Sequence, residues 1–179
     1  MKSRSFMIIL YPDDSSHVNC LDYIKSNFED YAYILHDKDF TDDGIIKKPH
    51  YHVVIKFSNP RSLSSLSSEL NIPENFISIS YKSYKSALKY LIHFDDKQKF
   101  QYSIEEVHGT LKKNLINLLN NEKQEDYFVL QIIYELDNIV GFVSVRDFVL
   151  IICRLGLWSY FRRASVIFLE ILKEHNSKY

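Results

Sequence analysis

An alternating segment at residues 47–57 constrains the fold of this chain more than any other part of the sequence. Side chains alternate between the two faces of a β-strand, so His50 and His52 share one face with Val54 and Lys56. The opposite face is apolar, which predicts a buried strand that begins with two imidazoles side by side. Two imidazoles held on a rigid element favour half of a metal site.

Hydrophobic periodicity in the first hundred residues predicts an alternation of strands and helices. Strands are expected at residues 5–11, 31–36, 50–57 and 75–81, with a short one at 99–102. Helices are expected at residues 16–28, 59–70 and 83–93. Pro60 suits the first turn of the second helix. The order of elements predicts an α+β fold, a ferredoxin-like (split βαβ) antiparallel sheet with helices packed against it.

The sequence pattern changes after about residue 111. Residues 111–119 have a helical pattern, the polar residues 120–125 are a candidate hinge, and further helical patterns follow at 127–136, 146–155 and 158–174. The last pattern is apolar on most sides, which is more than about 55 residues can bury alone. We therefore expect a first domain at residues 1–122 and a small all-α oligomerisation domain at residues 123–179. The alternative is that these helices pack against the sheet domain.

Composition limits the possible functions. The 179 residues include 22 Lys and Arg and 23 Asp and Glu, with a net charge of −1, so binding to nucleic acid has to depend on local basic patches. No stretch is long and apolar enough to span a membrane, and no membrane partner is expected. Cys20 and Cys153 form no spacing motif and are expected to be buried thiols in a reducing cytosol.

His36 and Asp39 come at the end of the second predicted strand. Antiparallel pairing with the third strand would bring them to His50 and His52. Three imidazoles and a carboxylate, without a thiolate, form a borderline-hard site with positions open for water or a phosphate oxygen. Mn²⁺ or Mg²⁺ would suit chemistry at phosphate, and Zn²⁺ would also suit these ligands. The alternative is a solvated strand end beside an ordinary acidic loop.

Tyr90 and His93 lie on the polar face of the predicted helix at residues 83–93, whereas Leu88 and Leu91 belong to its apolar stripe. A tyrosine in such a position is most often an exposed aromatic residue. Beside a metal, however, it can serve as a nucleophile toward phosphorus.

These residues together resemble the motifs of the HUH endonucleases. Within that superfamily the chain is most similar to the small plasmid replication initiators (Rep) that start rolling-circle replication. A His-x-x-Asp at His36, a His-x-His at His50 and a Tyr-Leu-x-His at Tyr90 occur in matching order and spacing within residues 5–105. Three motifs in register are more specific than any one of them.

The resemblance implies a metal-dependent nicking enzyme. Tyr90 would attack a phosphodiester of single-stranded origin DNA, leaving a free 3′-OH primer and a 5′-phosphotyrosyl link, and His93 would position groups or transfer a proton. Mn²⁺ is the expected ion, with Mg²⁺ and Zn²⁺ as alternatives. The implied metal ligands are His36, Asp39, His50 and His52.

The resemblance also implies partners. They are single- and double-stranded plasmid origin DNA, further copies of the chain in a ring such as a hexamer, and a host helicase and polymerase in the bacterial cytoplasm. Basic side chains near the site are candidate DNA contacts, although each alone could be ordinary solvated surface. These candidates are Lys47, Lys48, Lys56, Lys82, Lys85 and Lys89.

Other functions stay open. One is a relaxase or single-strand transposase with the same chemistry, which the single candidate nucleophile and the helical tail count against. Another is a non-catalytic, oligomeric DNA-binding protein on the same fold, which a missing ligand or tyrosine would have favoured. A histidine-based phosphoesterase would need a third histidine where Val54 stands.

Overall fold

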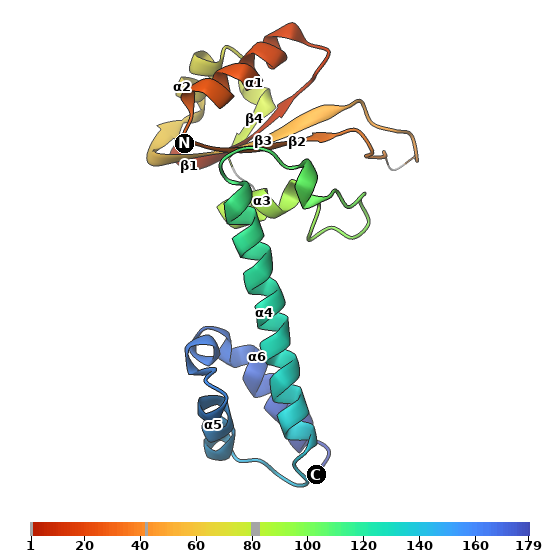
Figure 1. Ribbon diagram of the computed structural model, residues 1–179, viewed down its shortest axis with the longest axis vertical. Helices are drawn as coiled ribbons and strands as arrows, with labels where there is room; N and C mark the ends of the chain where they lie inside the picture. The colour runs from red at the N-terminus through yellow and green to blue at the C-terminus, as the bar shows by residue number, and fades with distance from the viewer. Residues whose placement is uncertain (1, 42, 80–82) are drawn as a thin grey trace. The chain divides into compact units, whose positions relative to one another are not determined.

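The computed structural model describes residues 2–41, 43–79 and 83–179. The chain divides into two compact units, Met1–Leu118 and Leu119–Tyr179. The first unit contains the sheet and the second is helical (Figure 1).

The first unit is built on a four-stranded antiparallel sheet with the order β2-β3-β1-β4. Its strands and helices are β1 (Lys2–Leu10), α1 (Ser15–Asn27), β2 (Asp30–His36), β3 (His50–Ser62), α2 (Leu63–Leu70), β4 (Ile77–Ile79) and α3 (Tyr84–Tyr90). Strand β3 lies between β1 and β2, the two strands joined by α1, which is the split βαβ arrangement. The predicted α+β, ferredoxin-like fold is therefore confirmed.

The two faces of the sheet differ in what covers them. Helices α1 and α2 lie on one face and α3 on the other (Figure 1). The core beneath α1 and α2 takes alternate residues of β1 and β3, among them Phe6, Ile8, Val53 and Ile55. His52 lies on the opposite face, as the period of two predicts. The alternation in β3 thus separates the core from the face that carries the histidines.

Strand β3 is longer than predicted, and it runs through Pro60, which was expected in the first turn of a helix. After an irregularity in register between Ser3 and Ser5, the far end of β3 still pairs with β1, with Lys2 opposite Ser62. Proline lacks an N–H, and such a break in register is where a strand tolerates it. Helix α2 then begins at Leu63, with the side chain of Ser62 as its N-cap.

Other elements also differ from their predicted boundaries. A 3₁₀ turn at Glu74–Phe76 replaces the first part of the predicted strand at 75–81, and residues 80 and 81 lie outside the described chain. Within the described residues, 99–102 form no strand. Helix α3 ends at Tyr90, three residues before the predicted end.

The second unit contains most of α4 (Lys112–Asp137), together with α5 (Val145–Arg154) and α6 (Trp158–Asn176). The predicted hinge at residues 120–125 is wrong, because α4 is continuous there. That stretch is polar but holds no proline or glycine, and Glu, Lys and Gln are good helix formers. Phe148 and Phe168 are fully buried in the core of this unit.

The two cysteines differ in exposure. Cys20 is buried as predicted, but Cys153 is exposed, so the prediction of two buried thiols is wrong for the second.

Among the described residues, no helix combines the length and the apolar character needed to cross a membrane.

Candidate metal and tyrosine site

Three imidazoles come together where β2 ends and β3 begins. Antiparallel pairing sets His36 directly opposite His50, and His52 follows two residues later on the same face. The ring centroid of His36 lies 5.7 Å from that of His50 and 4.6 Å from that of His52. The strand register alone therefore assembles the three histidines.

Backbone carbonyls orient two of these rings. Nε2 of His36 lies 2.8 Å from the Leu91 carbonyl oxygen, and Nδ1 of His50 lies 2.8 Å from that of Lys48. A carbonyl only accepts, so these nitrogens donate. In a neutral ring the other nitrogen, Nδ1 of His36 or Nε2 of His50, then keeps its lone pair free. A histidine that binds metal commonly anchors its other N–H in this way.

Further observations fit a bound cation. Nδ1 of His36 is buried and has no hydrogen-bond partner, and Nε2 of His50 lies 3.1 Å from Nε2 of His52. Two ring nitrogens at that distance need a proton or a cation between them. Ligand atoms lie within 4.8 Å of one another in two groups that share His36. These groups are His36, His50 and His52, and His36, Asp39 and His93.

Asp39 contributes the carboxylate. Its Oδ2 lies 3.4 Å from Nδ1 of His36, and its Oδ1 accepts a hydrogen bond of 3.2 Å from the hydroxyl of Tyr102. The Tyr102 ring stacks on His36 with centroids 4.3 Å apart. Burial and the neighbouring Asp39 raise the pKa of Tyr102, so its hydroxyl stays protonated and donates. The sequence had not indicated this supporting tyrosine.

Burial favours the neutral form of His36, His52 and His93. It lowers the pKa of His36 to about 4, although the hydrogen bond to Leu91 acts in the opposite direction. Burial, with the neighbouring histidines, lowers the pKa of His52 well below its ordinary value, and burial also lowers the pKa of His93. A histidine binds metal in its neutral form, so these rings are in the state that coordination requires.

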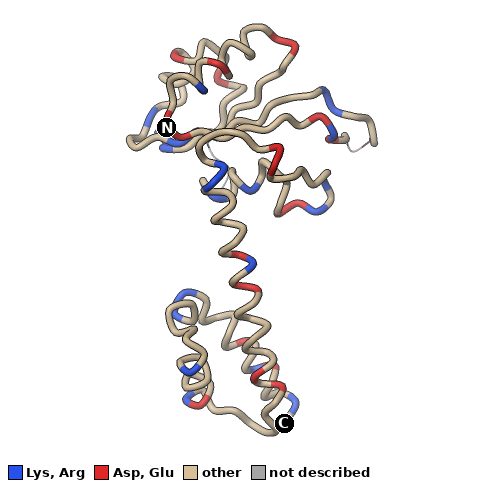
Figure 2. Tube along the Cα trace, in the orientation of Figure 1, with Lys and Arg blue, Asp and Glu red and all other residues tan. Residues whose placement is uncertain are grey.

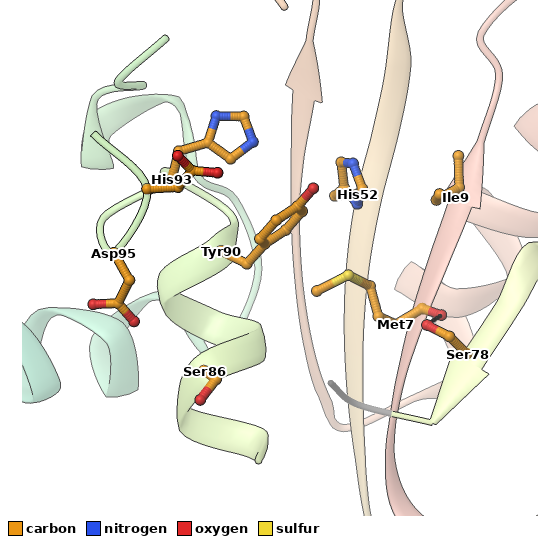
Figure 3. Close-up of a pocket in the computed structure, with 9 residues that line it drawn as sticks. Met7, Ile9, His52, Ser78, Ser86, Tyr90, His93 and Asp95 are labelled. Carbon is orange, nitrogen blue, oxygen red and sulfur yellow. Dashed lines mark hydrogen bonds between the residues drawn. The ribbon is translucent and has the colours of Figure 1, made fainter. Parts of the chain in front are cut away.

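Helix α3 carries Tyr90 to this cluster. Buried Ala87 and Leu88 anchor the helix, and the Tyr90 ring lies 5.2 Å from His52, centroid to centroid. In Figure 3, Tyr90 points from α3 toward His52 on the sheet. Both line a cavity of about 610 Å³ that also touches Met7, Ile9 and Ser78 (Figure 3).

His93 lies in the turn after α3, with a positive φ of 54°, and is buried rather than on an exposed helix face. Its Nδ1 donates to the Phe100 carbonyl at 2.8 Å, and its ring centroid lies 5.1 Å from that of Tyr90. Lys99, in the same loop, donates from Nζ to the phenolic oxygen of Tyr90 at 3.0 Å. This lysine was absent from the sequence prediction because it belongs to no motif.

The lysines named as DNA contacts lie in different surroundings. Lys47, Lys48, Lys56 and Lys85 are exposed. Lys48 forms an ion pair with Asp13, and Lys89 forms one with Asp95. Lys82 lies outside the described residues. Figure 2 shows basic positions interspersed with acidic ones, in agreement with the net charge of −1.

Comparisons with known proteins find plasmid replication proteins among its relatives. Residues 1–115 match the family described as plasmid replication protein, origin binding domain. A replication protein of Staphylococcus aureus is 28% identical over 158 residues, which cover 82% of this chain and 75% of that protein. The replication protein RepB of Lactiplantibacillus plantarum is 33% identical over 107 residues, 56% of this chain and 45% of the relative.

A replication protein of Onion yellows phytoplasma (strain OY-M) is 35% identical over 94 residues, 46% of this chain. The match spans only 25% of that relative, as against three quarters of the staphylococcal one. The family match extends over more than half of the chain and includes both strands and the helix that carry the site. The chain therefore belongs to the family of plasmid replication proteins that contain this origin-binding domain.

Proposed function

We propose that the chain initiates plasmid rolling-circle replication as a site-specific, metal-dependent DNA nicking-closing enzyme. Family membership supports the role in plasmid replication. The main observation in support of the nicking chemistry is the position of Tyr90. Its ring centroid lies 5.2 Å from that of His52, in a cavity at the edge of the histidine cluster. A nucleophile beside imidazoles with free lone pairs is suited to attack on a phosphodiester.

The proposed metal ligands are His36 through Nδ1, His50 through Nε2, His52 and Asp39. Nitrogen and carboxylate ligands without a thiolate suit Mn²⁺, Mg²⁺ or Zn²⁺, and we propose Mn²⁺. A divalent ion supplies polarisation of the scissile phosphate when it is bound. Tyr102 holds Asp39 in place through its hydroxyl.

In the proposed reaction, the phenolic oxygen of Tyr90 forms a bond to phosphorus and the bond from phosphorus to the 3′-oxygen breaks. The phenolic proton passes to water, and the departing 3′-oxygen takes a proton from water to become the 3′-OH primer. One phosphate ester replaces another, so the reaction needs no nucleotide cofactor and can run backward to rejoin the strand. His93, which holds the loop after α3, is assigned a positioning role.

The DNA strand is proposed to lie along the cavity that contains Tyr90. Ser78 and Met7 line that cavity from the sheet. The exposed Lys56 and Lys85 lie on β3 and α3, the two elements that carry His52 and Tyr90. Phosphate contacts from such lysines would supply affinity without reading sequence.

The proposal includes a nicking domain at residues 1–122 and an oligomerisation module at 123–179. The second unit exposes large apolar side chains, including Leu130, Val140, Phe142 and Val166. Apolar surface of this kind supports assembly of several copies into a ring. We also propose that the protein binds double-stranded origin DNA and acts together with a host helicase and polymerase.

The test is a nicking assay on single-stranded oligonucleotides from the origin of the plasmid that encodes the chain, with Mn²⁺ and a denaturing gel. Wild type is expected to form a covalent DNA adduct that disappears in Tyr90→Phe. Tyr84→Phe, on the same helix, is the matched control and should retain the adduct. An adduct that persists in Tyr90→Phe would assign the nucleophile to another tyrosine. Absence of cleavage by wild type, with DNA and Mn²⁺ both bound, would favour a non-catalytic binding protein.

A further inference from the structure

Lys99 contacts the reacting atom of the proposed nucleophile. Its Nζ lies 3.0 Å from the phenolic oxygen of Tyr90 and 4.7 Å from the centroid of the ring. The lysine comes from the loop after α3, nine residues beyond the tyrosine. Its side chain is 34% exposed, so it lies partly within the site rather than free in solvent.

The loop holds Lys99 from both sides. The Phe100 carbonyl, next in the chain, accepts a hydrogen bond of 2.8 Å from the buried His93. The side-chain amide of Gln101 donates to the carbonyls of His93, Asp96 and Lys99 at 3.2, 2.8 and 3.0 Å. These bonds fix the backbone that presents the lysine, which lowers the entropic cost of holding a long side chain in one place.

The Lys99 side chain is charged in this position. Partial burial opposes the charge, but the hydrogen bond to Tyr90 and the nearby carboxylates of Asp96 and Asp39 raise the pKa of Lys99 above its usual range. An ammonium group has three donors and no acceptor. Lys99 is therefore a hydrogen-bond donor to the phenolic oxygen and does not act as a base.

We propose that Lys99 is a catalytic residue that stabilises negative charge on the phenolic oxygen of Tyr90. As the bond to phosphorus forms and the bond to the 3′-oxygen breaks, the phenolic proton leaves to water and the ammonium group faces the nucleophilic oxygen. In the rejoining reaction the 3′-oxygen loses its proton to water and forms the bond to phosphorus, while the bond from phosphorus to the phenolic oxygen breaks. Lys99 stabilises this leaving oxygen until it takes a proton from water. This inference rests on the proposed function, because it requires Tyr90 to be the nucleophile.

The experiment compares single-turnover rates of nicking, and of rejoining from the isolated adduct, in the full-length protein with the same origin oligonucleotides and Mn²⁺. Lys99→Gln is expected to slow both reactions by about 10- to 100-fold, the effect of losing one hydrogen bond to a charged group. Lys99→Arg keeps the charge and should retain most of the rate. Lys97→Gln, an exposed lysine in the same loop, is the matched control and should react like wild type.

Two further measurements separate catalysis from structure. The Mn²⁺-induced rise in Tm should be the same in Lys99→Gln and wild type, because Lys99 is not one of the proposed metal ligands. In Lys99→Ala, added ethylammonium should restore part of the rate, whereas tetramethylammonium, which cannot donate a hydrogen bond, should not.

The outcomes distinguish this inference from the proposed function. If wild type forms no adduct through Tyr90, the proposed function fails and the inference fails with it. If wild type forms the adduct but Lys99→Gln nicks and rejoins at the wild-type rate, only the role of Lys99 is overturned. A slow Lys99→Gln whose Mn²⁺-induced rise in Tm is also lost would assign Lys99 to the structure of the site and overturn a catalytic role.

Discussion

The pH dependence of folding tests the electrostatics of the histidine cluster in metal-free protein. His36 is fully buried, and burial lowers its pKa from 6.5 to about 4 against the opposing hydrogen bond to Leu91. Below pH 6.5 the unfolded chain binds a proton at this ring that the folded chain does not. The contribution of His36 to the free energy of unfolding is therefore fully present above pH 6.5, and it is lost as the pH falls toward 4.

The magnitude follows from the two pKa values. The interval between about 4 and 6.5 corresponds to roughly 3 kcal/mol in the free energy of unfolding, of which about 2 kcal/mol is already lost at pH 5. The pKa values of His52 and His93 are also lowered, so their effects have the same sign. The substitution His36→Gln removes one titrating group and should reduce the loss of stability between pH 7.5 and 5 by about 2 kcal/mol.

Hydrogen exchange of the β2 and β3 amides measures the stability of the first unit, once intrinsic exchange rates are corrected for pH. The protein is treated with EDTA and measured from pH 7.5 to 4.5. Trp158 is the sole tryptophan and belongs to the second unit, so its fluorescence during urea unfolding provides an internal control. Equal pH dependence of β2–β3 protection in wild type and His36→Gln would refute the reasoning about burial.

Three other predictions concern the tyrosine that hydrogen-bonds Asp39, a glycine with a positive φ, and a lysine proposed to contact DNA. Tyr102→Phe removes the hydrogen bond to Asp39 and should weaken Mn²⁺ binding about 10- to 100-fold in a calorimetric titration; unchanged affinity would contradict a supporting role. Gly109→Ala should lower the free energy of unfolding in urea by about 1–3 kcal/mol, because φ is +103° and a Cβ would lie 2.5 Å from the Tyr31 carbonyl oxygen. An unchanged unfolding midpoint would show that alanine is not strained at this position. If Lys56 contacts a phosphate, Lys56→Ala should reduce the slope of log affinity for single-stranded DNA against log salt by about 0.7, and an unchanged slope in filter binding would exclude the contact.

The face of β3 that carries the histidines was predictable because it depends on a local rule. Side chains in a strand alternate strictly, so His50 and His52 had to share a face once the strand was recognised. The error at Pro60 arose because a proline at this position has two possible meanings. Pro60 is compatible both with the start of a helix and with an irregular strand. It lies in a strand because this end of β3 pairs with β1.

The hinge prediction failed for a related reason. Residues 120–125 are polar, and polarity alone does not separate a loop from a solvated turn of helix. Glu, Lys and Gln in that stretch favour helix, so α4 continues through it. The exposure of Cys153 likewise depends on how α5 packs in its unit, which the lone residue does not reveal.

The sequence by itself determined the alternating strands, the ferredoxin-like order of elements and the candidate ligands and tyrosine, because these follow from periodicity and from short motifs. Only the tertiary structure decided that Tyr102 holds Asp39 and that Lys99 reaches Tyr90. Both residues lie in an irregular segment without periodicity, where hydrogen bonds to distant parts of the chain set the position of each side chain. Asp39 and Tyr102, for example, are 63 residues apart in the sequence.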